Sequence, residues 1–175
     1  NSTTGGLDIA YSATSNSYIV VYESYFEGNI YGRILDAFGN PTGSRFQIDT
    51  PSQQFSRNVQ VTWNSVNNEY LATYMGSPGN GFDYFAQRVS ATGALLGSNL
   101  ALATGQTVYN FGGVAYASNA NKYLVVYDGG ASMPYGQFVS NTATLLASAF
   151  AIGSGTMTGW APAAAYDSLR HEFLV

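Results

Sequence analysis

The chain has 175 residues, the size of one domain with a substantial buried core. Only 9% of its residues are charged and 15% are aromatic, which excludes an intrinsically disordered chain. Its net charge of -4 and isoelectric point near 4.6 argue against a nucleic-acid partner, and the absence of cysteine excludes disulfides and cysteine-based metal sites. No apolar run approaches the roughly 18 residues of a membrane span, so we expect no membrane partner.

The first part of the chain predicts four strands, over residues 7–12, 18–23, 29–36 and 44–48. Each segment is short, rich in aromatic and β-branched residues, and bounded by Asn, Gly, Ser or Pro. A polar turn separates the first two segments, and residues 37–43, which are dense in turn formers, separate the last two. No window shows helical periodicity, so we expect almost no helix.

The same four-strand pattern recurs along the chain at intervals of about 50 residues. Its clearest mark is a pair of aromatic residues: Tyr11 and Tyr18, Trp63 and Tyr70, Tyr116 and Tyr123, Tyr166 and Phe173. We expect Tyr18, Tyr70 and Tyr123 to occupy equivalent buried sites, and Tyr22, Tyr74 and Tyr127 to be equivalent to one another. The repeats predict one domain over residues 1–175, with units at about 7–57, 58–111 and 112–161 and a partial unit at 162–175.

Four strands in about 50 residues are typical of a β-propeller blade. The units resemble those of bacterial secreted β-propellers: an aromatic, six residues, Tyr-Leu-Val-Val-aromatic, a loop, Tyr-Gly-Gln, then Gly-x3-Gly-x2-Phe-x-Ile. The resemblance covers nearly the whole chain, but the third unit has Ala143 and Ala147 in place of both glycines. It implies an all-β fold of four-stranded antiparallel meanders, an extracellular or cell-surface location, and a scaffold rather than a reaction. A β-sandwich, the alternative architecture, does not explain the recurrence of both aromatics.

Three and a half units are too few for a closed ring, because propellers close with roughly four to eight blades. An open arc would leave a hydrophobic sheet face and a strand edge in water at each end. Either two or more copies of the chain complete a ring, or the sequence is part of a longer protein. We therefore expect the chain to be its own partner, as a homo-oligomer rather than a stable monomer.

The loops that precede each first strand, and those between the second and third strands, share one face of a propeller. Aromatic rings beside amides and carboxylates suit sugars, whose C–H faces stack on rings while the hydroxyls form hydrogen bonds. The ligand-binding residues predicted on this face are Trp160, Phe55, Tyr109, Phe111, Asp8 and Gln60. We expect Trp160 to contribute most, since its ring offers the largest stacking surface. Packing between blades is the alternative role for each of these aromatics.

No catalytic residue can be assigned. A glycosidase needs two carboxylates about 5 to 10 Å apart, and five acids share the predicted face without forming an evident pair: Asp8, Asp83, Asp128, Glu23 and Glu27. The single histidine, His171, falls in a turn, and the chain has neither a phosphate-loop nor a zinc motif, so we expect no cofactor and no metal.

The sequence thus predicts a non-catalytic extracellular binding or scaffold module for a glycan or a protein. Two alternatives stay open. One is a glycoside hydrolase with an acid pair on the channel face, and the other is a structural fragment with no activity of its own.

Overall fold

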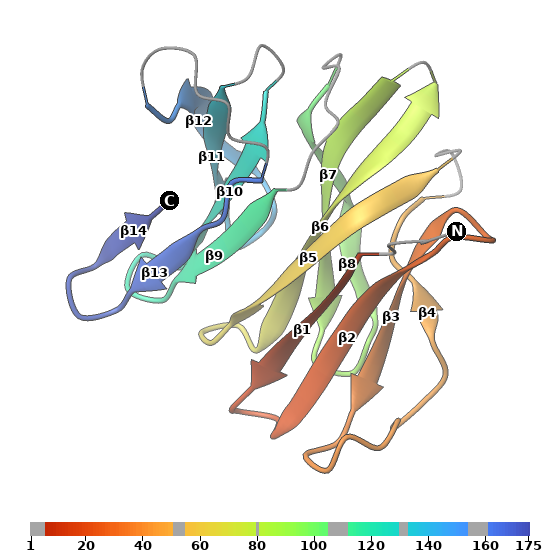
Figure 1. Cartoon of the computed structure of the whole chain (residues 1–175). Helices are drawn as coiled ribbons and strands as arrows, with labels where there is room; N and C mark the ends of the chain where they lie inside the picture. The colour runs from red at the N-terminus through yellow and green to blue at the C-terminus, as the bar shows by residue number, and fades with distance from the viewer. Residues whose placement is uncertain (1–5, 51–54, 80, 105–111, 130–132, 154–160) are drawn as a thin grey trace.

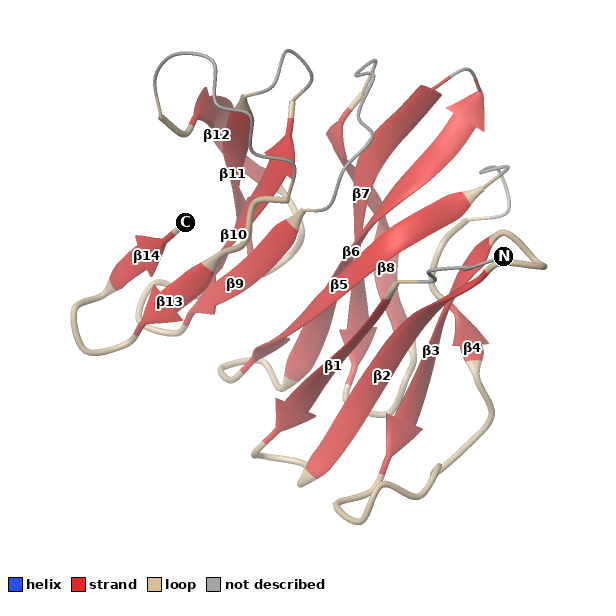
Figure 2. Cartoon of the chain, viewed as in Figure 1, coloured by secondary structure: helices blue, strands red, loops and turns tan. Residues whose placement is uncertain are grey.

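The computed structural model describes residues 6–50, 55–79, 81–104, 112–129, 133–153 and 161–175. Within these ranges the chain is all-β and contains no helix (Figure 2). Three four-stranded antiparallel sheets follow one another along the chain, and a two-stranded sheet follows them. No helix long and apolar enough to cross a membrane is present in the described residues.

Each sheet is a meander, with its strands side by side in chain order. Sheet I contains β1 (Leu7–Ser12), β2 (Ser17–Ser24), β3 (Asn29–Leu35) and β4 (Phe46–Gln47). Sheet II contains β5 (Ser56–Asn64), β6 (Glu69–Gly79), β7 (Gly81–Ser90) and β8 (Leu95–Ala103). Sheet III contains β9 (Gly113–Ala117), β10 (Lys122–Asp128), β11 (Pro134–Ser140) and β12 (Leu145–Ala151). Sheet IV contains β13 (Ala165–Asp167) and β14 (Glu172–Leu174). The four strands expected in the first unit are therefore all present at the expected places.

The sheets stand face to face in an open fan, with the first strands β1, β5, β9 and β13 side by side (Figure 1). The turns that join the first and second strands of all four sheets lie along one end of the fan, here called the hairpin end. The β2–β3 turn lies at the opposite end, here called the loop end. The arrangement is compatible with a repeat β-propeller-like fold, and the described residues do not close into a ring.

Sheet II is apolar on both faces because side chains alternate along a strand. Tyr70, Ala72 and Tyr74 of β6 lie in a buried cluster with sheet I. Leu71 and Met75 of the same strand lie in a second buried cluster with sheet III. Two separate hydrophobic layers, one on each side of sheet II, therefore hold the fan together.

The paired aromatics of the repeat are direct neighbours across the first two strands of each sheet. Tyr11 pairs with Tyr18 in the register of β1 and β2, and the other three pairs match in the same way. Tyr70 and Tyr123 are fully buried, as expected. The expectation was wrong for Tyr18, which is only half-buried. Tyr18 faces away from sheet II, and no described sheet packs against that face.

The Tyr-Gly segment of the repeat is explained by the fourth strand. A Cβ atom on Gly32 would lie 2.6 Å from the ring of Phe46, its cross-strand partner in β4. Sheet III repeats the arrangement, with Gly136 below the ring of Phe150. In sheet II, Ala86 takes the glycine position and pairs with Leu100 instead of a phenylalanine. The larger alanine and the smaller leucine together keep the summed volume of the pair nearly the same.

Candidate functional site

A cleft of about 260 Å³ opens at the loop end, where the β2–β3 turn of sheet I meets the start of β5 in sheet II. Its lining comes from Glu23, Tyr25, Gly28, Phe55, Ser56 and Arg57. Segments about 30 residues apart in the sequence thus build one concave surface. This is the face on which the sequence predicts a ligand.

Backbone hydrogen bonds fix the two walls of the cleft to each other. The Ser56 N–H donates to the Gly28 carbonyl at 2.7 Å, which ties β5 to the turn of sheet I. Gly28 has φ of 69°, a conformation that glycine adopts at little cost. The Ser77 N–H donates to the Phe55 carbonyl at 2.8 Å. The backbone at the start of β5 is therefore bonded to sheet I through Ser56 and to β6 through Phe55. The walls are therefore defined before any ligand arrives.

The cleft presents one acid and one base that do not neutralise each other. Glu23 accepts a hydrogen bond from the Gly6 N–H through Oε2 at 3.3 Å, which leaves Oε1 without a partner among the described residues. The Arg57 guanidinium lies over the Phe82 ring, 4.6 Å from its centroid, and forms no ion pair with a described residue. A hydrogen-bond acceptor and a set of N–H donors thus remain available at the cleft.

The nearby Glu27 is already engaged. Both of its oxygens accept hydrogen bonds from Arg45 at 2.9 Å, and the Ser24 hydroxyl donates to one of them at 2.7 Å. The Arg45 hydrogen bonds lower the pKa of Glu27, with a further contribution from Ser24. Glu27 is therefore a structural anion that fixes the β2–β3 turn.

Two aromatic rings stand exposed around the cleft. Phe55 is 54% exposed and Tyr25 is 63% exposed, whereas the repeat tyrosines of sheets II and III are buried. The ring of Phe26 meets Tyr25 edge-on, with centroids 5.9 Å apart. Exposed rings beside polar groups in a concave surface are the features of a sugar-stacking site.

The predicted site residues do not all meet at this cleft. Phe55 lines it. Asp8 lies on β1, where its Oδ2 accepts from the Val61 N–H at 2.8 Å and its Oδ1 from the Ile9 N–H at 2.9 Å, so its carboxylate bridges β1 to β5. Gln60 lies on β5, and its amide donates to the Val59 carbonyl at 3.1 Å. Neither Asp8 nor Gln60 lines the cleft.

The remaining predicted residues, Trp160, Tyr109 and Phe111, lie outside the described residues. The cleft is also lined by Tyr25 and Arg57, which were not among the predicted ligand-binding residues. A signal for Arg57 was available, because it is one of only six basic residues and lies two positions after Phe55 in the same predicted loop.

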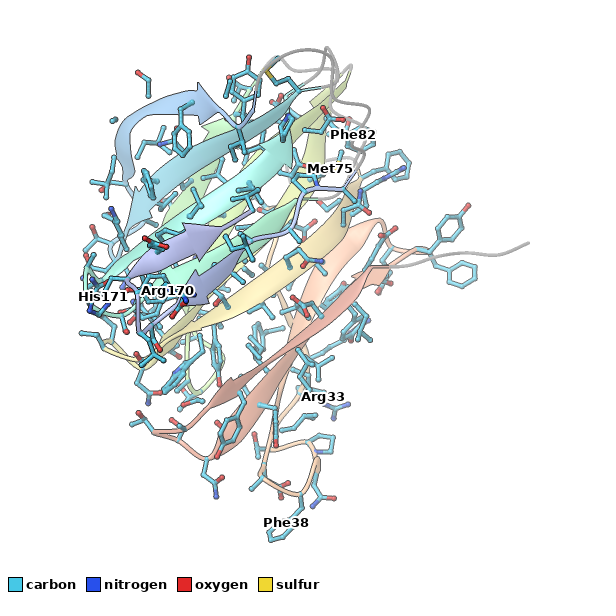
Figure 3. The ribbon with its side chains drawn as sticks, turned by 60° about the vertical axis from the view of Figure 1, so that its left-hand side comes forward. Arg33, Phe38, Met75, Phe82, Arg170 and His171 are labelled. Atoms are coloured by element: carbon cyan, nitrogen blue, oxygen red, sulfur yellow. The ribbon has the colours of Figure 1, made fainter. Side chains whose placement is uncertain are left out.

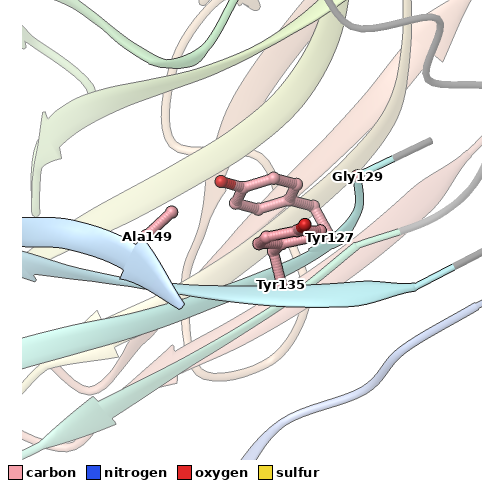
Figure 4. Close-up of a pocket in the computed structure, with 4 residues that line it drawn as sticks. All are labelled: Tyr127, Gly129, Tyr135 and Ala149. Atoms are coloured by element: carbon pink, nitrogen blue, oxygen red, sulfur yellow. The ribbon is translucent and has the colours of Figure 1, made fainter. Parts of the chain in front are cut away.

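A second pocket, of about 160 Å³, lies in sheet III and is lined by Tyr127, Gly129, Tyr135 and Ala149 (Figure 4). The rings of Tyr127 and Tyr135 stack, with centroids 6.2 Å apart. A Cβ on Gly129 would lie 2.2 Å from the Tyr135 ring, so glycine is needed there for the ring to pack. None of the described residues that line this pocket is charged, which makes the cleft between sheets I and II the better candidate.

Among the described residues, no group of three or more His, Asp or Glu side chains is placed to hold a metal ion.

No protein-family model matches the chain, and no curated protein matches its sequence. The structure is similar to a solved structure of hydrazine synthase from Kuenenia stuttgartiensis, with a TM-score of 0.64 and 10% sequence identity. The match covers 95% of this chain and 56% of that one, so the chain spans little more than half the length of the matched structure. At this identity the likeness shows the fold alone.

Proposed function

We propose that the four sheets are blades of a β-propeller and that the chain is a non-catalytic extracellular module that binds carbohydrate in the cleft between sheets I and II. The observation that carries the proposal is the set of groups around the cleft. Exposed Phe55 and Tyr25 rings stand beside an Arg57 guanidinium and a Glu23 carboxylate that are not paired with each other. The extracellular location rests on the resemblance of the repeats to secreted propellers.

The recognition chemistry follows from these side chains. The apolar C–H face of a sugar ring stacks on Phe55 or Tyr25, while Arg57 donates to ring or hydroxyl oxygens and the free Glu23 oxygen accepts from a hydroxyl. A cleft of about 260 Å³ lies just below the usual range of roughly 300 to 1,000 Å³ for ligand pockets. It suits a single sugar unit whose neighbours in the glycan extend into solvent.

The use of the carboxylates favours binding over hydrolysis. A glycosidase needs two carboxyl groups flanking the scissile bond. Asp8 accepts two backbone N–H groups and Glu27 is held by Arg45, so that Glu23 is the one acid among the described residues that line the cleft.

The test is a calorimetric titration of the chain with neutral and acidic oligosaccharides. Phe55→Ala should weaken binding about thirtyfold, which corresponds to the roughly 2 kcal/mol of a stacking anchor. Phe38→Ala is the matched control, because Phe38 is 90% exposed and projects from the end of the fan opposite to Phe82 (Figure 3). Binding that is equally insensitive to both substitutions would remove the cleft as the site.

The same sugars, as chromogenic glycosides, test the hydrolase alternative. We expect no turnover. Turnover that Glu23→Gln abolishes would replace the binding function with catalysis, and a failure of every sugar to bind would return the chain to a structural role or to a protein ligand.

A further inference from the structure

The two outer sheets of the fan, sheet I and sheet IV, each have one exposed apolar face. The equivalent faces of the other sheets are buried between neighbouring sheets. On the open face of sheet I, Leu7, Ile9 and Tyr11 are 66%, 52% and 43% exposed. Their counterparts in sheet II include Val59 and Val61, which are buried against sheet I. The open face of sheet I is thus the repeat equivalent of a described sheet-to-sheet interface.

Sheet IV is open on the opposite face. Leu174 of β14 is 73% exposed. The residues at the same repeat position, Ile19, Leu71 and Leu124, are 0%, 0% and 2% exposed. An apolar position that is covered in three sheets is therefore uncovered in the fourth.

Contacts between the first strands show how such faces meet. Asp8 of β1 reaches the Val61 N–H of β5 at 2.8 Å. At the same repeat positions further along, a Cβ on Gly113 of β9 would lie 2.8 Å from the backbone N of Ala164, which precedes β13. In both cases a residue of one first strand contacts a residue of the following repeat unit that lies one repeat position later. The same contact made from sheet IV to sheet I joins Ala163 to Ile9, because Ala163 shares the repeat position of Asp8 and Gly113.

At the hairpin end, side-chain hydrogen bonds, here called polar ties, join the turn of one sheet to the turn of the preceding sheet. Asn68 lies in the left-handed conformation of its turn, with φ of 51°. Its Oδ1 accepts from the Ser12 hydroxyl at 2.7 Å, and its Nδ2 donates to the Ser15 hydroxyl at 2.8 Å. An asparagine that the turn requires thereby also binds the turn of the preceding sheet.

Sheet III repeats this tie. Asn121, with φ of 44°, accepts from Asn64 at 3.2 Å and donates to Asn67 at 3.1 Å. The equivalent residue of sheet I is Asn16, with φ of 48°. Asn16 accepts from the Tyr11 hydroxyl at 2.8 Å, and its Nδ2 has no partner among the described residues.

The turn of sheet IV carries groups that match Asn16. Asp167 stands at the repeat position of Ser12 and Asn64, and Arg170 at that of Ser15 and Asn67. The backbone N–H groups of Arg170 and Leu169 lower the pKa of Asp167, which keeps an acceptor there. Asp167 can accept from the Asn16 amide, and the Arg170 guanidinium can donate to the Asn16 oxygen.

We propose that the open face of sheet I docks head to tail on sheet IV of a second copy of this chain, by the same contacts that join neighbouring sheets within one copy. The surface is apolar at its centre, with Ile9 and Tyr11 meeting Leu174, and polar at the hairpin end, with Asn16 meeting Asp167 and Arg170. A second copy of the chain is the partner that fits, because these surfaces have the same repeat positions as the interfaces between sheets within one copy. Two copies supply eight sheets, which is within the range at which propellers close.

The test uses the absence of cysteine from the chain. Two single-cysteine variants, Ile9→Cys and Ala163→Cys, are mixed under oxidising conditions. Ile9 lies in β1 and Ala163 lies two residues before β13, and the repeat equivalents of the two positions face each other across the interfaces within one copy. Head-to-tail docking predicts a disulfide-linked dimer in the mixture and much less from either variant alone.

Two results would overturn this docking. One is cross-linking by Ile9→Cys alone that matches the mixture, since a symmetric face-to-face dimer would explain it. The other is a wild-type chain that sediments as an 18.6 kDa species at micromolar concentration with no cross-link in the mixture. Ile9→Arg should raise the dissociation constant of the dimer at least tenfold, and Phe38→Arg should leave it unchanged. The carbohydrate cleft lies within one copy, so the titration of the cleft and this test can fail independently.

Discussion

The interface between sheets I and II and the open face of sheet I are built from the same repeat positions. Tyr70 is fully buried in the first, whereas its equivalent Tyr18 is only half-buried in the second. Their cross-strand partners differ in the same direction, since Trp63 packs against the core cluster and Tyr11 is 43% exposed. A repeat therefore specifies which face of a sheet is apolar, while the neighbouring sheet decides whether that face is buried.

The largest expected effect comes from removing the equivalent tyrosines on the two faces. Tyr70→Ala should lower the free energy of unfolding by about 3 to 5 kcal/mol, as for other large-to-small substitutions of buried aromatics. Tyr18→Ala should cost only about 1 kcal/mol in the dissociated chain, because the Tyr18 side chain is partly exposed there and no neighbouring sheet covers it. Urea unfolding at low protein concentration measures both. Equal losses would mean that the open face is packed within one chain.

A smaller difference is expected for the asparagines of the polar ties. Asn121→Ala and Asn16→Ala both place alanine at a positive φ, so the backbone cost is shared. Asn121 also loses its bonds to Asn64 and Asn67, which connect sheets II and III. Asn121→Ala should therefore destabilise the chain by about 1 to 2 kcal/mol more than Asn16→Ala. Identical unfolding midpoints for the two variants would show that the tie adds nothing to stability.

The smallest expected effect is a pH dependence that separates the inside of the fan from its surface. Asp49 is 4% exposed, and burial raises its pKa, an effect that Ser56 partly opposes. Its contribution to stability is full below the ordinary carboxyl pKa near 3.8 and is lost as the pH rises through its higher folded pKa. Asp49→Asn should accordingly gain stability relative to wild type between pH 3 and pH 7.

Asp36, at the surface, is the control with the opposite sign. Hydrogen bonds from Asn40 lower the pKa of Asp36, so its contribution is present above the ordinary pKa and is lost as the pH falls. Asp36→Asn should lose stability relative to wild type between pH 3 and pH 7. Unfolding curves are measured for both variants at pH 3 and pH 7. If the stability relative to wild type changed in the same direction for both variants, the opposite pKa shifts of Asp49 and Asp36 would be contradicted.

Much of the fold follows from the sequence because its signals are local. The alternation of apolar residues and the Asn-rich turns indicate each strand, and the spacing of Tyr11 and Tyr18 makes them cross-strand neighbours in a short hairpin. The burial of Tyr18 could not be predicted in the same way. It depends on the sheet that stands next to it, and the repeat carries no information about which sheets have a neighbour.

The candidate site was less accessible to sequence reasoning. Phe55 could be predicted because it is an aromatic residue in a loop on the predicted ligand face, at a position where the repeat has no fixed aromatic. Its convergence with Glu23 could not be predicted, because it depends on the packing of sheet I on sheet II. Asp8 departs from the repeat as well, and the structure gives its carboxylate a backbone N–H partner in β5. A departure from the repeat therefore marks a position with a special role without distinguishing ligand binding from structure.

The most direct test of the contrast between the two faces is hydroxyl-radical footprinting of the tyrosines at a series of protein concentrations. We expect Tyr70 and Tyr123, which are both 0% exposed, to be protected at every concentration. Tyr11 should react readily in dilute solution and become protected as the concentration rises and a second copy covers it. Protection of Tyr11 and Tyr18 equal to that of Tyr70 in the most dilute sample would contradict the account, because it would show that the face is already buried within a single chain.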